Sequence, residues 1–311
     1  MSNTTHPAFA PIAHWLEAST APSVAMLNGW AREAGVALPA SRPIRFVAAP
    51  RARQSALDYE RQIALRGEVA TRPGTRHDYF NALAWLAFPL AKAALNAIHV
   101  SAESCERRTR GPTREAQGDR SNRESTLEAD ARHPNLHSRD KEAAPAPTAN
   151  ARNRARDAAT LLDENGVIVA CADAGWLALW REHAWRELFW TRRADIPRIM
   201  RVVAIGHGLL QKLVRPFPAI TARALVIPLD PASLPDDSSA SAARLDAAAA
   251  AQLKAFGPLF APTALLRLPV AALPGWDPDR DCLGERRFDD ASVFRPRSHS
   301  GFVPSFQTSE A

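Results

Sequence analysis

Six polar or amphipathic residues recur at spacings of three, four and seven within one stretch of the chain: Asp78, Asn81, Trp85, Lys92, Asn96 and His99. At about 100° per residue on a helix, they fall within an arc of roughly 80°. Most other positions of this stretch are apolar around the whole circumference, which is typical of a buried helix. Because buried polar groups must be paired or in contact with water, the pattern predicts a core helix that lines a polar cavity.

The same stretch and its lead-in carry groups suited to acid–base chemistry. His77 or His99 can act as a general base that Asp78 orients. Arg76 and Lys92 can hold an anionic group, and a lysine in so arginine-rich a chain suggests that a compact ammonium is needed there. We assign these candidate roles: catalytic His77, Asp78 and His99, and ligand-binding Arg76, Asn81, Trp85, Lys92 and Asn96.

Two structural interpretations remain open for these residues. In the first, they form a buried network in which Asp78 caps the helix, Lys92 pairs with a carboxylate elsewhere, and Asn96 bonds to a loop carbonyl. In the second, they form an ordinary solvent face, although such faces usually carry Glu and Arg. We prefer the functional cavity.

A second candidate is Gly206-His207-Gly208. Each glycine costs roughly 1 kcal/mol relative to Ala inside a helix, so another backbone or a ligand must approach closely there. His207 and Gln211 share a helix face, but His-x-x-x-Gln is a poor metal pair. We prefer close helix packing as the explanation, keep His207 as a ligand-binding candidate, and predict no metal site.

A third candidate region precedes the strongest turn signal in the chain. Residues 158–162, 163–166 and 167–172 predict a strand, a tight Asn-Gly turn and a second strand, so that Asp163 and Glu164 are turn residues. Arg156 and Asp157, just before the first strand, are ligand-binding candidates that can alternatively pair with each other.

The elements that must position these groups are mainly helical. Pro89 predicts a kink in the 78–99 helix or its division in two. Elsewhere the pattern predicts helices at 57–67, 175–193, 197–214 and 244–256, strands at 43–47, 222–229 and 264–270, and an extended tail from 273. The fold class is therefore α+β, a mainly helical single domain with a small β-sheet or hairpin.

One stretch has a different composition from the rest. Residues 101–150 are densely charged with few large apolar side chains, which predicts a long disordered insertion. We divide the chain into an N-terminal helical part of the core domain at 1–100, the insertion at 101–150, the remainder of the same core at 151–300, and a flexible C-terminus at 301–311.

Composition narrows the possible classes of function. The net charge is +6, and of 39 basic residues only four are Lys, but the arginines alternate with Asp and Glu instead of forming a tract, which weighs against nucleic-acid binding. The three cysteines lack a CxxC pair, which excludes a disulfide framework and a cysteine zinc site. No signal peptide is evident, and Pro89, Lys92 and Asn96 argue against a membrane span. We expect a soluble cytoplasmic protein.

Several long motifs occur in an order that resembles a known family: RHDYFNALAWLAFPLAKAALNAIH at 76–99, RDAATLLDENGVIV at 156–169, GHGLLQKLVRPFPAITARAL at 206–225, and LPGWDP with FDDASVFRP at 273–278 and 288–296. These stretches are similar to the bacterial family catalogued as domain of unknown function 3025. The resemblance brings no assigned reaction.

We therefore expect a polar cavity, formed by the 76–99 helix and His207, that binds a small anionic or polar ligand and can transform it by hydrolase-like acid–base catalysis. GxSxG, P-loop, HExxH and GxGxxG motifs are absent from the sequence, so serine-triad and nucleotide-dependent chemistry by the standard folds are disfavoured. Two alternatives remain: a nucleic-acid-binding protein that uses its Arg surplus, and a structural or interaction protein without catalysis. Cofactor and oligomeric state are left open.

Overall fold

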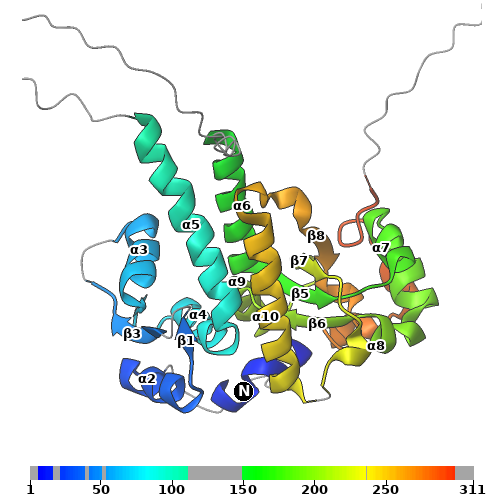
Figure 1. Ribbon diagram of the computed structural model, residues 1–311. Helices are drawn as coiled ribbons and strands as arrows, with labels where there is room; N and C mark the ends of the chain where they lie inside the picture. The colour runs from blue at the N-terminus through cyan, green and yellow to red at the C-terminus, as the bar shows by residue number, and fades with distance from the viewer. Residues whose placement is uncertain are drawn as a thin grey trace, which may run out of the picture.

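A four-stranded sheet lies at the centre of the larger part of the molecule, in the order β6-β5-β7-β8 (Figure 1). The computed structural model describes residues 6–16, 22–38, 42–50, 54–110, 149–235 and 237–297. β5 (Gly166–Ala170) pairs in parallel with β7 (Thr221–Ile227) and antiparallel with β6 (Arg201–Ala204), and β8 (Leu266–Pro269) pairs antiparallel with β7. Every residue of β5 is buried, as expected for a strand covered on both faces.

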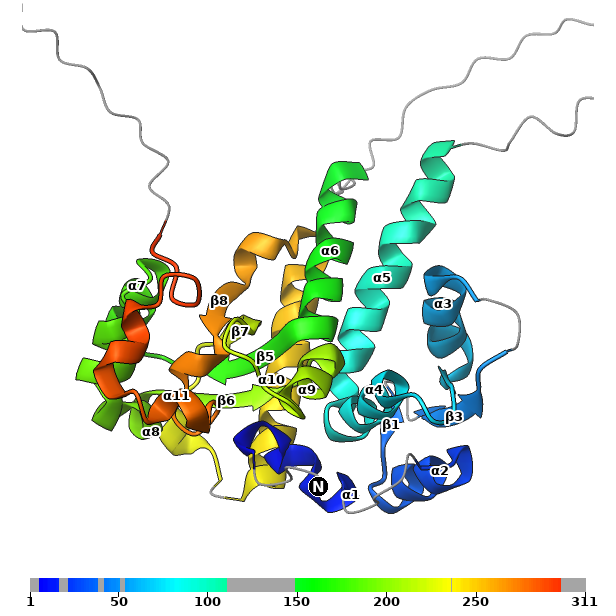
Figure 2. The same ribbon diagram turned by 180° about the vertical axis from the view of Figure 1, so that it is seen from behind.

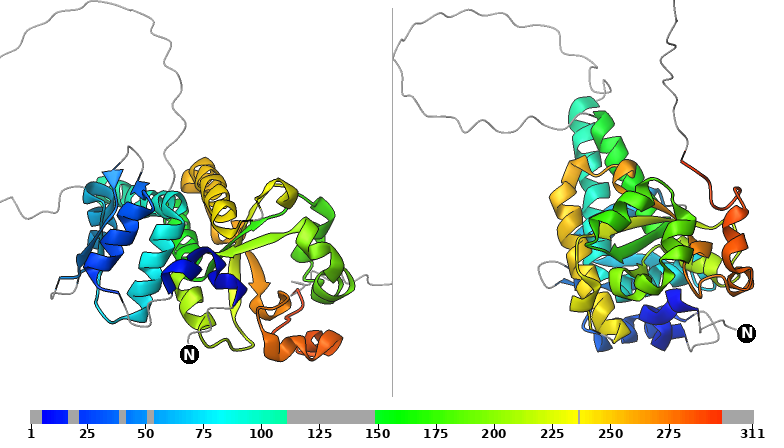
Figure 3. Two further views of the ribbon diagram at one scale, coloured as in Figure 1. Left: turned by 90° about the horizontal axis from the view of Figure 1, so that it is seen from below. Right: turned by 90° about the vertical axis from the view of Figure 1, so that its right-hand side faces the viewer.

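The alternation along β5 separates two hydrophobic clusters. Ile168 and Ala170 belong to the cluster formed with three long helices, α5 (Pro89–Arg110), α6 (Ala149–Asn165) and α10 (Ser238–Phe256). Val167 and Val169 belong to the cluster formed with the N-terminal segment, α7 (Ala174–Arg181) and the C-terminal tail. Successive strand residues point to opposite faces, so one buried strand anchors both layers. Figure 3 shows α10 (Ser238–Phe256) on one side of the strands and the tail on the other.

Two long helices run side by side beside this sheet: α5 (Pro89–Arg110) and α6 (Ala149–Asn165) (Figures 1 and 2). The predicted hairpin is therefore wrong, because residues 158–165 are helical and Asn165-Gly166 joins α6 to β5. The Asn-Gly pair suggests a turn, but the apolar residues before it have helical spacing. Ala155, Ala158, Ala159 and Leu162 are all buried, and their spacing of three and four residues places them on one helix face.

The N-terminal part carries a second, smaller set of elements. β3 (Arg45–Ala48) pairs in parallel with β4 (Glu68–Thr71), and α3 (Ala56–Arg66) connects them. The predicted strand at 43–47 and helix at 57–67 are confirmed, and Gly67 ends α3 in the left-handed region with φ 70°, which glycine adopts without strain. α1 (Ala13–Leu16), α2 (Val24–Glu33), β1 (Ala37–Leu38) and β2 (Arg42–Pro43) complete this part.

The predicted break at Pro89 is confirmed. α4 (Arg76–Ala87) ends there, and the first part of α5 is bent from it by 112°. The six polar residues are therefore divided between two helices and do not share one continuous helix face. No single helix among the described residues is long and apolar enough to cross a bilayer, although α4 and the start of α5 meet that criterion when taken together.

Several other predictions need correction. The helix predicted at 175–193 is α7 (Ala174–Arg181) followed by a π turn at Glu187–Thr191. The helix predicted at 197–214 is interrupted by β6, so that α8 (Ile196–Ile199) and α9 (His207–Leu213) lie on either side of a strand. Val202 and Val203 favour that strand. The tail contains α11 (Pro278–Asp281) and a 3-10 turn at Gly284–Asp289, so it is only partly extended.

The remaining short 3-10 turns are Pro7–Ile12, Arg193–Asp195, Pro231–Ser233, Gly257–Leu259, Pro262–Ala264 and Val270–Ala272. The strands predicted at 222–229 and 264–270 and the helix at 244–256 are confirmed as β7, β8 and α10. The mainly helical α+β class is therefore confirmed. Most of the predicted insertion, and the C-terminus from 301, lie outside the described residues, while residues 101–110 continue α5 as helix.

A buried carboxylate fixes the start of α5 at the bend. Asp246 of α10 accepts hydrogen bonds from the backbone amides of Leu90 at 3.0 Å and Ala91 at 2.7 Å, which replaces a side-chain cap supplied by α5 itself. Burial raises the pKa of Asp246 to about 6, because it outweighs the two amide hydrogen bonds that lower the pKa.

We expect Asp246→Ala to lower the free energy of unfolding by about 1–3 kcal/mol, because two amides lose their acceptor. The pKa of Asp246 is higher in the folded state than in the unfolded state, so protonation of Asp246 stabilises the folded protein. This stabilisation is fully present below about pH 4 and is lost as the pH rises through about 6. The loss in the variant should therefore be larger at pH 4 than at pH 8 in urea unfolding. Arg244→Ala, at an exposed position of the same helix, is the control, and equal losses at both pH values would contradict the assignment.

Candidate metal centre and polar cavity

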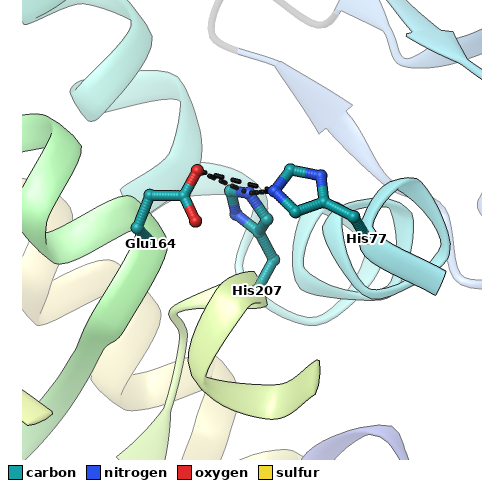
Figure 4. Close-up of side chains that lie close together, drawn as sticks. All are labelled: His77, Glu164 and His207. Carbon is teal, nitrogen blue, oxygen red and sulfur yellow. Dashed lines mark hydrogen bonds and ion pairs between the residues drawn. The ribbon is translucent and has the colours of Figure 1, made fainter. Parts of the chain in front are cut away.

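Three side chains from three different helices lie close together (Figure 4). His77 lies in the first turn of α4, Glu164 in the last turn of α6, and His207 is the first residue of α9. The two Nε2 atoms of His77 and His207 lie 3.2 Å apart. Oε1 of Glu164 lies 3.3 Å from Nε2 of His207 and 3.6 Å from Nε2 of His77.

The two glycines that flank His207 make this meeting possible. A Cβ on Gly206 would lie 2.3 Å from the backbone nitrogen of Gly166, and one on Gly208 would lie 2.6 Å from Oε2 of Glu164. No side chain fits at either distance, so α9 can pack against the α6–β5 junction only with glycine at both positions. The preferred explanation of Gly206-His207-Gly208, close packing, is confirmed, and its partner is the end of α6.

The separations of these three atoms suit a tetrahedral metal ion. In a four-coordinate zinc site with metal–ligand distances of about 2.0–2.2 Å, neighbouring ligand atoms lie about 3.3–3.6 Å apart. The three separations observed here are 3.2, 3.3 and 3.6 Å. His77, Glu164 and His207 thus form a grouping of ligand atoms that could hold a divalent ion. Two imidazoles and one carboxylate, with a fourth position left over, form a donor set that occurs in catalytic zinc sites.

The other ring nitrogen of each histidine faces a second carboxylate. Nδ1 of His77 lies 3.4 Å from Asp78, and Nδ1 of His207 lies 3.6 Å from Asp163. Histidine ligands of metals commonly donate this nitrogen to a carboxylate, which fixes the ring and its tautomer. Nδ1 of His207 is buried, and no group among the described residues lies within hydrogen-bond distance of it.

A cation holds each of these outer carboxylates. Asp78 accepts hydrogen bonds from the backbone amide of Arg72 at 2.7 Å and from its guanidinium at 2.8 and 2.9 Å. Burial would raise the pKa of Asp78, but these bonds and the contact with His77 hold it well below its usual range. The alternative that Asp78 caps α4 is wrong, because Thr75 occupies the cap position.

On the opposite side, Asp163 pairs with the ammonium of Lys92, which is 3% exposed. Lys92 also donates to Oδ1 of Asn81 at 2.9 Å, and Asn81 donates to the hydroxyl of Tyr59 at 2.8 Å. Burial raises the pKa of Asp163, but the charge and hydrogen bond of Lys92 together with the charges of His207 and His99 outweigh it, so that the pKa lies below its usual value. Lys92 therefore takes the structural role that we had left open, as the partner of a carboxylate.

The remaining groups differ in their readiness to ionise. Hydrogen bonds with Asp78 and Glu164 raise the pKa of His77 to about 9, so its imidazole is a poor general base at neutral pH. Contacts with His207 and His77 lower the pKa of Glu164. Burial raises the pKa of Glu60 to about 7, although a bond from Asn96 at 2.6 Å opposes it.

A cavity of about 750 Å³ adjoins the cluster. Six of the predicted site residues line it: His77, Asp78, Asn81, His99, Arg156 and His207. Asn96, Lys92 and Trp85 lie behind its wall, where Asn96 donates to the carbonyl of Glu60 at 2.8 Å and Lys92 lies 5.3 Å from the centre of the Trp85 ring. Asp157 is exposed and lines no cavity described for the chain, and Arg76 lines a different pocket.

Sequence reasoning missed Glu164, Asp163, Glu60, Tyr59 and Arg72, which all line the cavity. Asp163 and Glu164 were assigned to a turn because the helical period of residues 155–162 was not used. The grouping of His77, Glu164 and His207 has no local motif, since the residues come from three separate segments. Only the pair of glycines around His207 indicated that its helix meets another backbone.

Lys92 offers a direct test of the buried network. We expect Lys92→Met to lower the free energy of unfolding by about 3 kcal/mol, because it leaves the Asp163 carboxylate without its countercharge. The double variant Lys92→Met/Asp163→Leu should recover part of that loss. Lys254→Met, at an exposed position, is the control in urea unfolding, and a Lys92 variant as stable as this control would disprove the network.

Comparison with known proteins gives a family but no activity. The model of the family described as "Protein of unknown function (DUF3025)" matches residues 44–119 and 131–298. No curated protein and no solved structure matches the chain. The matched segments contain His77, Glu164 and His207, and they cover most of the chain. The chain therefore belongs to the DUF3025 family.

Proposed function

We propose that this protein is a hydrolase of small polar substrates that uses a divalent metal ion, zinc in the first instance, held by His77, Glu164 and His207. The observation that carries the proposal is the mutual separation of their three ligand atoms, between 3.2 and 3.6 Å. The sequence led us to expect acid–base chemistry without a metal. We now prefer a metal because a carboxylate that sequence reasoning had placed in a turn completes the ligand set.

The surroundings support a catalytic ion over a purely structural one. Structural zinc sites are usually closed by four protein ligands, whereas catalytic sites leave one position to water or substrate. Here three ligands line a cavity of about 750 Å³, within the range of small-molecule sites. A divalent ion in this position would lower the pKa of a bound water and polarise a substrate oxygen.

The chain's own residues divide the remaining work. Asp78 and Asp163 face the Nδ1 atoms of the two imidazoles, and Arg72 and Lys92 keep these carboxylates charged. Glu60 is suited to accept the proton of the attacking water, because burial brings its pKa to about 7 and a general base works best when its pKa is near the working pH. The water oxygen bonds to the carbonyl carbon or phosphorus, the bond to the leaving group breaks, and Glu60 returns the proton to that group.

Metal binding is the first test. We expect purified protein to bind one equivalent of Zn²⁺, and His207→Ala and Glu164→Gln to weaken this binding by more than the 10–100-fold typical of losing an outer carboxylate. His99→Ala is the matched control, because His99 lines the same cavity without belonging to the ligand set. Measurement is by metal analysis after dialysis and by titration of chelator-stripped protein.

Thermal unfolding supplies an independent readout of the same binding. An ion at a hundred times its dissociation constant should stabilise the folded state by about 2.7 kcal/mol. Folded protein that takes up no divalent ion would refute the proposal. So would a His207 variant that binds zinc as tightly as the His99 variant.

Hydrolysis is tested with a panel of small carboxylic esters, amides and phosphate esters. We expect activity that a chelator abolishes and Zn²⁺ restores. The rate should rise as the pH passes about 7, because Glu60 must lose its proton before it can act as the base. Glu60→Gln should lower kcat by 10²–10⁴-fold, roughly the range expected for loss of a general base, and should abolish this rise of the rate with pH. The charged neighbours that also act on Glu60 are Asp163, Lys92 and Arg156. Activity that survives complete metal removal would contradict the mechanism.

A further inference from the structure

A second pocket, of about 520 Å³, adjoins His77 and Glu164 of the same cluster. His77 and Glu164 line both this pocket and the polar cavity. These two residues therefore border both spaces, and a molecule bound in the second pocket lies next to two of the three proposed ligands.

The second pocket is basic. Arg76 comes from the first residue of α4, Lys212 from α9, and Arg215 from the segment after α9. All three are exposed, and within the described part of the chain none has a carboxylate within ion-pair distance, although many other arginines do. Glu164 is the one carboxylate among the described residues of the lining, and its charge would be committed to the metal ion.

The donors that remain available point to an anion with several oxygens. Lys212 gives one hydrogen bond to Oδ1 of Asn165 at 2.6 Å, and an ammonium has three donors. The guanidinium groups of Arg76 and Arg215 present planar pairs of N–H donors that match phosphate geometry. Phe217, 50% exposed, adds an apolar surface at the same pocket.

We propose that this second pocket binds a phosphate group of the substrate through Arg76, Lys212 and Arg215 and so positions the rest of the molecule at the metal cluster. This inference rests on the proposed function, since it names the class of molecule that the hydrolase acts on. A phosphate dianion fits better than a single carboxylate for two reasons. Three cations without an ion-pair partner among the described residues line the pocket, and the phosphate oxygens can accept hydrogen bonds from more than one guanidinium at once.

The test uses inorganic phosphate as the probe, titrated calorimetrically into both chelator-stripped and zinc-loaded full-length protein. We expect binding to both forms, and Arg76→Gln and Arg215→Gln each to weaken it about tenfold, as expected for loss of a charge-assisted hydrogen bond. Arg286→Gln removes the same charge at an exposed position outside the pocket and should leave the affinity unchanged. Acetate should bind at least tenfold more weakly than phosphate.

The outcomes separate this inference from the proposed function. If zinc binds as proposed but phosphate affinity is the same in Arg76→Gln, Arg215→Gln and Arg286→Gln, the inference is wrong and the metal site stands. Phosphate that binds only to zinc-loaded protein, and is lost with His207→Ala alone, sits on the ion and also refutes the inference. If no metal binds but phosphate binding depends on Arg76 and Arg215, the anion pocket stands and the hydrolase proposal fails.

Discussion

The site depends on a contact between two backbones that leaves no room for a side chain. Gly206 and Gly208 lie against the junction of α6 and β5, and a Cβ on either would fall within 2.6 Å of a neighbouring heavy atom. Because α9 begins at His207, this contact fixes the imidazole relative to the last turn of α6. One turn of α6 carries both Asp163 and Glu164, so the same packing brings one carboxylate to each nitrogen of the His207 ring.

Around this contact the charges form two similar chains. On one side Arg72 holds Asp78, which faces His77, and on the other Lys92 holds Asp163, which faces His207. Burying carboxylates is costly unless cations and hydrogen bonds compensate them. The polar residues that the sequence places in α4 and α5 are therefore divided between the lining of the cavity and a buried layer behind it. In that layer Lys92 pairs with Asp163, Asn96 donates to Glu60, and Trp85 lies against Lys92.

The sequence predicted the elements whose patterns are local. The period and glycine stop of α3, the alternation of β7, and the effect of Pro89 all follow from neighbouring residues. It also predicted that polar groups on a buried helix gather at a cavity; of the six residues in that pattern, Asp78, Asn81 and His99 line the cavity beside the cluster, whereas Trp85, Lys92 and Asn96 do not. It failed at residues 158–165, where an Asn-Gly pair suggests a hairpin although the alanines before it fit a helix. Since Glu164 lies there, the error removed one residue of the site, and the pairing of three distant segments has no local signal.

The placement of α5 and α6 has a consequence for how the site is encoded. These two helices run side by side, and their outer ends lie away from the sheet (Figure 2). His77 precedes this connection, whereas Glu164 and His207 follow it. The three proposed ligands are thus split between two halves of the polypeptide, and neither half alone carries all three. If the chain were cut in this connection, the two fragments could bind the proposed metal ion only when they associate, so metal binding would report their association.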